Sequence, residues 1–514
     1  MNKYIYKTVL IVVLAIGLWA CSDEFLDKQP TDALSSETFW ASESDGELAL
    51  TGVYGRLQER IVAFAVSDRP RNYIAWDAAT DDAYQTYDYG WRQIIDGTMT
   101  PSTGGTVGLL YGICYNGIAT ANTFLANADR LSENGVSTDL VNQWKGEVHF
   151  IRAFWYYTLA VTYGDVPLRI EPSSVENQDI EKSTQAQIFA QVETDLGIAI
   201  TNLAERNFDD GHANKAAANA LLARALLYQG KYAEAADAAE EAILGGSFSL
   251  TDDYSAMFAD ATQENNNEVM FSIKTNHTTG ETHAWGGSLE AMIAGWGAIH
   301  PTKDFVDSFE AIDGLPITSS PYYDENNPME NRDPRLSKYV VEGSLNPDFE
   351  NQPLEGFSWI KWLSPATIVD PKNPPATNGT DAIIIRYADA LLMYAEGKIE
   401  SNNIDASVLD AINQVRARAY GVAVSDVGNY PAITTTNQAE LRTIIRNERR
   451  HEFGLEGLRY FDLKRWGIAE QVLNGLYDPF MDNERIFLPK HMKLPLPQSA
   501  IDKNENLDQN PDYK

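Results

Sequence analysis

The sequence predicts a mainly α-helical protein, in which tetratricopeptide-like helix pairs scaffold a large irregular loop region with short β pieces in a single compact domain. The first observation is the Ala-rich stretch 216–244, which has the pattern of two helices broken at Gly230. The second is apolar residues at helical spacing in several other segments. The third is the region 248–381, where Gly, Pro, Asn, Asp and aromatic residues are frequent, a composition typical of loops.

Residues 1–20 have the features of a cleavable signal peptide. A short basic start precedes the apolar run Thr8–Ala20, which is shorter than the roughly 20 residues that a membrane-spanning helix needs. Cys21 follows an apolar and a small residue in the manner of a bacterial lipobox. We therefore expect lipidation at Cys21 with residues 21–40 as an acidic tether, since two or more acyl chains give stable anchoring. The alternative is a secreted protein cleaved near Ala20.

The composition limits the partners of the chain. Its 73 acidic and 40 basic residues give a formal net charge of −33. Such a surface repels nucleic acid and anionic lipid, and it disfavours polyanionic ligands unless a local basic pocket intervenes. Neutral ligands therefore suit the protein best.

With Cys21 acylated, the second cysteine, Cys114, has no disulfide partner and is expected to be a small core residue.

Residues 41–247 are predicted to form the N-terminal helical part. Around Gly230, small and apolar residues fall where a tetratricopeptide repeat places its interlocking positions: Leu222, Ala223, Tyr232, Ala235 and Ala242. In an earlier segment, Val148, Ile151, Trp155 and Leu159 recur at helical spacing, so we expect Trp155 in the core.

An aromatic loop, residues 76–92, interrupts this helical part. Tyr87, Tyr89 and Trp91 stand at every second position, so an extended backbone would point their rings the same way. One interpretation is a strand that packs its rings into the core. The other is a platform for the flat apolar faces of a ligand.

The remaining chain divides into the loop-rich region 248–381 and the C-terminal helices and closing segment, 382–514. Aromatic residues argue against disorder in the loop-rich region. In the segment Arg446–Gly467, acids alternate with arginines, so we expect internal ion pairs. We find no Gly-x-Ser-x-Gly or phosphate-loop motif, and the segment at His451 lacks the second His of a zinc protease.

Several long motifs resemble the SusD/RagB family of starch-utilisation-system lipoproteins, in the same order from the lipobox to the last residues. They are "EVHFIRAFWYYTLAVTYGDVPL", "NRDPRL", "IIRYADALLMYAEGK", "AINQVRARA", "RNERRHEFGLEGLRYFDLKRWG" and "LPLPQSAIDKNENLDQNPDY". The resemblance implies an outward-facing outer-membrane lipoprotein that captures oligosaccharides for a TonB-dependent, SusC-type transporter, with no catalytic centre and no cofactor. Capture of peptides and glycoside hydrolysis are the alternatives.

The resemblance also places part of the ligand site before the helix that contains "YNGIATAN". Sugar rings have apolar faces that stack on aromatic rings, and their hydroxyls need polar side chains at the edge. The candidate ligand-binding residues are Trp76, Asp82, Tyr84, Tyr87, Tyr89, Trp91, Arg92, Trp285 and Trp296.

Overall fold

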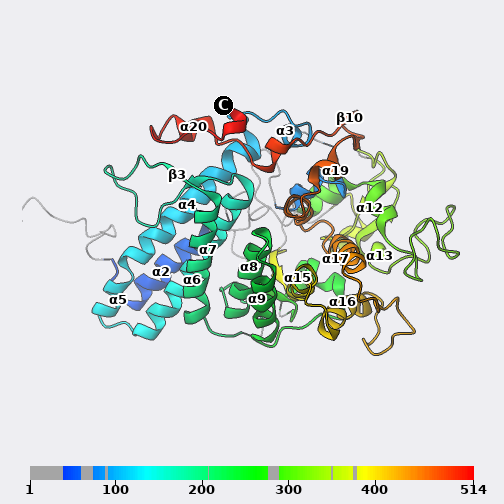
Figure 1. The fold of residues 1–514 in the computed structure, drawn as a ribbon, viewed down its shortest axis with the longest axis horizontal. Coiled ribbons are helices and arrows are strands. Elements are labelled where there is room, and N and C mark those ends of the chain that lie inside the picture. Colours follow the sequence, from blue (N-terminus) through cyan, green and yellow to red (C-terminus); the bar gives the residue numbers. More distant parts are fainter. Residues whose placement is uncertain are drawn as a thin grey trace, which may run out of the picture.

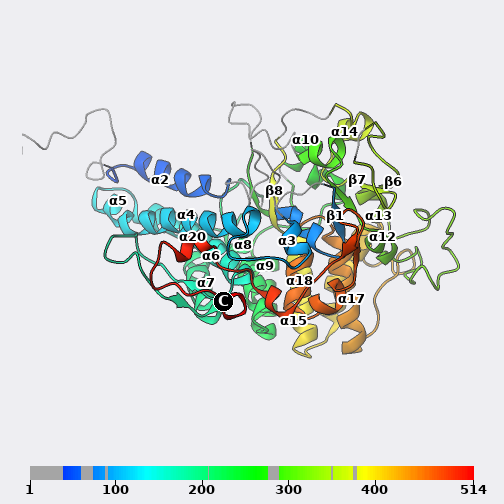
Figure 2. The same cartoon turned by 90° about the horizontal axis from the view of Figure 1, so that it is seen from above.

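The computed structural model describes residues 39–58, 73–86, 91–206, 208–264, 266–275, 289–348, 351–373 and 379–514. The described chain is mainly helical and its strands are short, which confirms the predicted fold class (Figure 1). Helices α2, α4, α5 and α6 lie at one end of the molecule, and the loop-rich region gathers at the other (Figure 2). Within the described ranges, no helix combines the length and apolar character that crossing a membrane requires.

The first helical part contains several long helices packed side by side and the short helices α3 and α5. Its helices are α2 (Glu43–Gly55), α3 (Arg92–Ile95), α4 (Gly105–Asn127), α5 (Asp129–Glu133), α6 (Thr138–Thr162), α7 (Gln185–Asn202), α8 (Lys215–Tyr228) and α9 (Tyr232–Leu244). Helix α6 packs against both α4 and α7 (Figure 1). Helix α7 begins with a capping box, in which Thr184 and Gln187 satisfy each other's backbone N–H groups.

The predicted helix pair is present as α8 and α9. The side chain of Asn214 caps α8 by accepting a hydrogen bond from the backbone N–H of Ala217 at 2.9 Å. Gly230 makes the turn between the helices with a φ of 72°, a conformation that favours glycine. Helix α9 then packs on α15, where a Cβ on Gly397 would lie 2.6 Å from the backbone oxygen of Tyr232. The close helix contact therefore depends on that glycine.

The second helical part follows the loop-rich region. Its helices are α15 (Tyr387–Glu400), α16 (Ala406–Ala419), α17 (Gln438–Glu452), α18 (Arg459–Arg465), α19 (Ala469–Leu473) and α20 (Gln498–Ile501). Helix α15 contacts α8, α9, α16 and α17, so it connects the two helical parts.

Short elements form the rest of the described chain. The strands make two-stranded antiparallel pairs: β1 (Ala83–Gln85) with β5 (Ile299–Pro301), β2 (Val166–Pro167) with β3 (Lys182–Ser183), β4 (Val269–Ile273) with β8 (Ala382–Arg386), β6 (Val340–Glu342) with β7 (Phe357–Trp359), and β9 (Tyr477–Asp478) with β10 (Asn483–Glu484). The short helices are η2 (Tyr73–Ala79), η3 (Tyr254–Phe258), α10 (Asp260–Gln263), the π-helix η4 (Ala291–Gly295), α12 (Lys303–Ser308), α13 (Leu336–Tyr339), α14 (Pro365–Val369), η5 (Pro489–Met492) and η6 (Pro511–Tyr513).

The predicted core residues are buried. Val148, Ile151, Trp155 and Leu159 have no exposed surface, which confirms the interpretation of their helical spacing. Cys114 is also buried, as predicted, and burial raises the pKa of its thiol.

A buried network of ion pairs connects α17 to its neighbours. Arg386 of β8 contacts Glu452 at 2.7 Å and Glu268 at 2.8 Å, and Arg335 contacts Glu448 at 2.7 Å. These charged side chains are buried away from solvent, so each needs an oppositely charged partner to remain ionised.

Within the segment Arg446–Gly467, Asp462 pairs with Arg449 and Arg465, as expected. The acids Glu448 and Glu452 instead pair with arginines outside the segment, so the expected internal pairing holds only in part.

Candidate functional site

Two segments that the sequence analysis selected for ligand binding lie side by side in the structure. Strand β1 from the aromatic loop pairs with β5 from the loop-rich region, and Tyr84 stands opposite His300. The contact continues beyond the strands, because the backbone N–H of Thr86 donates to the carbonyl of Ala298 at 3.1 Å. The β1–β5 pair therefore brings the end of the first aromatic segment next to the segment that contains Trp296.

Trp296 is an exposed residue at this pair. Trp296 comes directly after the π-helix η4 in the sequence. Its side chain keeps 40% of its surface exposed, which is unusual for so large an apolar group. The amide of Asn351 donates to the Trp296 carbonyl at 3.1 Å, and the amide of Asn346 donates to the Gly295 carbonyl at 3.4 Å. Amide side chains thus hold the backbone beneath an indole ring that is open to a ligand.

Polar atoms without partners accompany this ring. The side-chain nitrogen of Gln85 and the side-chain oxygen of Asn346 are buried and make no hydrogen bond to a described residue. Burial lowers the pKa of His300 to about 4, so its ring is neutral at pH 7. Buried polar groups are normally paired, and an unpaired group calls for an explanation such as a missing ligand or water. His300, Asn346 and Asn351 were not selected from the sequence, because only the β1–β5 pairing reveals their neighbours.

Three of the predicted aromatic ligands belong to the core instead. Trp91 is fully buried, and its ring meets the ring of Trp76 edge-on at a centroid distance of 4.7 Å. Trp76 also stacks on Tyr460 of α18 at 4.9 Å. Tyr84 is fully buried, and its hydroxyl accepts a hydrogen bond from the backbone N–H of Glu355 at 3.2 Å. The prediction of exposed rings at these positions is wrong, because Trp91 packs on Trp76, Trp76 packs on Tyr460, and Tyr84 lies against the segment at Glu355.

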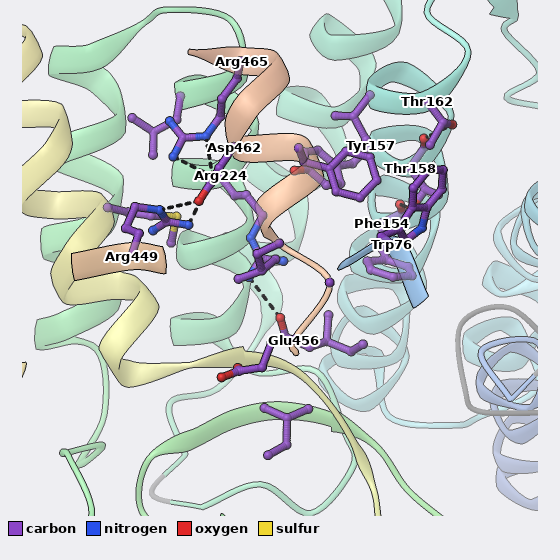
Figure 3. Close-up of a pocket in the computed structure, with 18 of the residues that line it drawn as sticks. Trp76, Phe154, Tyr157, Thr158, Thr162, Arg224, Arg449, Glu456, Asp462 and Arg465 are labelled. Carbon is purple, nitrogen blue, oxygen red and sulfur yellow. Dashed lines mark hydrogen bonds and ion pairs between the residues drawn. The ribbon is translucent and has the colours of Figure 1, made fainter. Parts of the chain in front are cut away.

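Trp76 also lines an internal cavity of about 120 Å³. Figure 3 shows it on the same side as Phe154, with charged residues of α17 and α18 across the cavity. There Asp462 accepts hydrogen bonds from Arg449 at 2.9 Å and from Arg465 at 2.8 Å. Because these charges pair with each other, the cavity is a gap in the packing around an ion-pair cluster.

The two predicted polar ligands have different environments. Asp82 is buried and contacts Arg450 at 2.6 Å, and burial raises its pKa to about 6. This pairing corrects its expected role at the ligand edge, because the carboxylate already holds a scaffold arginine. Arg92 starts α3 and has an exposed side chain with Asp96 at 3.9 Å. Arg92 therefore remains open to a ligand.

Four further predicted residues lie outside the described ranges: Cys21, Tyr87, Tyr89 and Trp285. Tyr87 directly follows Thr86, whose backbone is held beside Ala298.

The described residues contain no group of His, Cys, Asp and Glu side chains suited to holding a metal ion. Chemically, the exposed part of the site offers an indole face with amide side chains beside its backbone. Such groups stack on and hydrogen-bond to a ligand, and they match a binding site better than a reaction centre.

The sequence matches family models and curated proteins of one kind. A family model described as "SusD family" matches residues 346–513, and a model described as "Starch-binding associating with outer membrane" matches residues 24–227. The chain is 26% identical to SusD-like protein P25 of Formosa agariphila, over 97% of each chain. It is 24% identical to the starch-binding protein SusD of Bacteroides thetaiotaomicron, over 100% of this chain and 99% of the relative.

Solved structures agree with the sequence relatives. A SusD-like carbohydrate-binding protein from Bacteroides fragilis superposes with a TM-score of 0.77 at 27% identity, covering 92% of this chain and all of the other. A second SusD-like protein from Bacteroides fragilis has the same TM-score at 23% identity, covering 95% of this chain and all of the other. Since the two family models match separate parts that together exceed half of the chain, and the relatives and folds match nearly all of it, the protein belongs to the SusD/RagB family.

Proposed function

We propose that this protein binds oligosaccharides at the cell surface and delivers them to a TonB-dependent transporter of the SusC type. The observation that carries the proposal is the β1–β5 pair, which joins the aromatic loop to an exposed Trp296. An exposed indole with amides beside it suits the apolar face and the hydroxyls of a sugar ring.

The relatives support a carbohydrate as the ligand. The Bacteroides fragilis structure is described as carbohydrate-binding, and the Bacteroides thetaiotaomicron relative as starch-binding. Both names concern those proteins, and we extend the general class, a carbohydrate, to this chain.

We propose that Trp296 is the stacking surface of the site. Tyr87, Tyr89 and Trp285 are proposed to add further rings from the segments that adjoin it, and Arg92 to donate hydrogen bonds at the edge. Among the aromatic residues of this set, Trp296 lies within the described ranges, and its ring is exposed.

We further propose that the protein acts outside the cell, anchored in the outer membrane through lipidated Cys21. The match of residues 24–227 to a family described as associating with the outer membrane supports this location. Substitution Cys21→Ser should move the protein from the membrane fraction to the soluble fraction in cells that lack the transporter. Unchanged membrane partition of the variant would contradict the lipid anchor.

A binding panel tests the ligand class. Purified protein should bind one class of neutral oligosaccharide in a calorimetric titration and release no product after prolonged incubation with the same glycan. Release of shorter sugars would indicate a hydrolase, and binding of peptides in place of glycans would indicate a peptide-capturing relative. Co-purification of the SusC-type transporter with the tagged protein tests delivery, and its absence under mild extraction would contradict that part of the proposal.

A further inference from the structure

An open groove lies in another part of the fold from the β1–β5 pair. It has a volume of about 410 Å³ and runs between α4, the segment that follows β2 and the closing segment around α20. Figures 1 and 2 both place α20 against α4. Ligand pockets in proteins span roughly 300–1,000 Å³, so the groove has room for a short saccharide.

Hydrogen bonds between distant parts of the chain hold the groove walls in place. The buried amide of Asn122 on α4 donates to the carbonyl of Arg169 at 3.0 Å, and the hydroxyl of Tyr115 donates to the carbonyl of Pro167 at 2.6 Å. On the other side, the amide of Asn504 donates to the carbonyl of Ile180 at 2.9 Å. The walls are therefore preorganised, which lowers the entropic cost of binding.

Glycine and tyrosine residues of α4 form one wall. Gly112 is exposed within the helix, and a Cβ built on it would meet no atom within 4 Å. A glycine inside a helix is less favourable than alanine by about 1 kcal/mol. Next to it, the rings of Tyr111 and Tyr115 contact each other at a centroid distance of 4.7 Å. The helix thus presents bare backbone beside an aromatic pair, which leaves space for a flat group.

The charge of the groove is opposite to that of the protein. Arg169 and Lys503 line it, and the described residues that line it include no Asp or Glu, in a chain with a net charge of −33. The guanidinium of Arg169 donates to backbone carbonyls, including that of Asn177 at 2.6 Å. Asp502 and Glu505 flank Lys503 in the sequence but do not line the groove. Two cations without a facing carboxylate favour an anionic group.

We infer that this groove is a second saccharide site, which takes a short sugar carrying an acidic group, a carboxylate or a sulfate. The tyrosine pair supplies an apolar contact, Asn116 and Gln178 supply amides for hydroxyl groups, and Arg169 with Lys503 pair with the acid. The site is separate from Trp296, so it does not depend on the proposed neutral-glycan function.

The variant Gly112→Leu tests the site without removing any contact of the fold. Its side chain would enter the groove, and replacing an exposed helical glycine should leave the melting temperature equal or higher. The matched control is Gly197→Leu on α7, where a Cβ also meets no atom within 4 Å. Calorimetric titrations use digalacturonate, a sulfated galactose disaccharide and the unsubstituted galactose disaccharide.

We expect at least one acidic disaccharide to bind more tightly than the neutral one. Comparing digalacturonate with the sulfated disaccharide then shows whether the groove prefers a carboxylate or a sulfate. Gly112→Leu should weaken that binding by about tenfold or more, which corresponds to 1.4 kcal/mol, while Gly197→Leu and Trp296→Ala leave it unchanged. Lys503→Gln should reduce the preference for the acid, and Lys338→Gln should not. Equal binding of all three sugars, no binding of any acidic sugar, or full binding by Gly112→Leu would overturn the inference.

Discussion

The indole rings of Trp91 and Trp296 have opposite environments, although both lie in segments expected to bind a ligand. Trp91 is fully buried and contacts Trp76, whereas Trp296 keeps 40% of its surface exposed. A buried indole contributes to stability through packing, and an exposed indole contributes through what it binds. We therefore expect Trp91 to stabilise the fold and Trp296 to bind the ligand.

The substitution Trp91→Ala should lower the free energy of unfolding by about 3–5 kcal/mol, because it removes a buried aromatic ring and leaves a cavity. Trp155→Ala, at a second fully buried position, should behave in the same way. Chemical denaturation monitored by circular dichroism measures both. If Trp91→Ala unfolded at the wild-type denaturant concentration, the assignment of this ring to the core would be wrong.

At the scale of the element, helix α17 is held by ion pairs as well as by apolar packing. Glu452 accepts from Arg386 of β8 and Glu448 from Arg335, while Arg449 reaches Asp389 of α15 at 2.8 Å. Removing one partner of a buried pair leaves the other charge without compensation, which is more costly than the pair itself is favourable. The charged motif at the end of the chain is therefore a structural element.

Arg386→Met should lower the free energy of unfolding by about 3–5 kcal/mol, because Glu452 and Glu268 each lose a buried partner and keep fewer cations than the network provides. The matched control is Arg442→Met, since Arg442 pairs with Glu400 at 2.6 Å but has a side chain 35% exposed. A pair at the surface contributes only about 0–1 kcal/mol. Equal unfolding free energies for the two variants in urea would contradict the structural role of the network.

The same network predicts how stability depends on pH. Burial alone would raise the pKa of Glu452 and Asp333, but neighbouring arginines hold both pKa values at about 2. Their ordinary values are 4.5 and 3.8, so the folded state binds fewer protons in this range. The stability they contribute is complete above about pH 4.5 and is lost as the pH falls towards 2. The melting temperature should therefore fall as the pH is lowered from about 4.5 towards 2. A melting temperature that did not change over this range would contradict the ion pairs.

At the scale of the whole molecule, the helical scaffold could be predicted from the sequence and the exposure of the aromatic rings could not. The spacing of Val148, Ile151 and Trp155 is a local pattern, and it identified the buried face of α6 correctly. The burial of Trp76 depends on Tyr460, which is remote in the sequence and becomes a neighbour only through folding. The β1–β5 pair likewise joins two distant segments, so His300 and Asn346 carried no local signal.

Titration of an oligosaccharide that binds the wild type into Trp296→Ala tests whether the carbohydrate site lies at the β1–β5 pair. Stacking of one ring contributes on the order of 1 kcal/mol beyond area burial, and a central tryptophan can contribute more. We therefore expect the affinity to fall by about tenfold per 1.4 kcal/mol lost, with the melting temperature near that of the wild type. The matched control, Tyr322→Ala, removes another exposed ring from a different loop and should bind normally. Wild-type affinity of a folded Trp296→Ala protein would contradict a carbohydrate site at the β1–β5 pair.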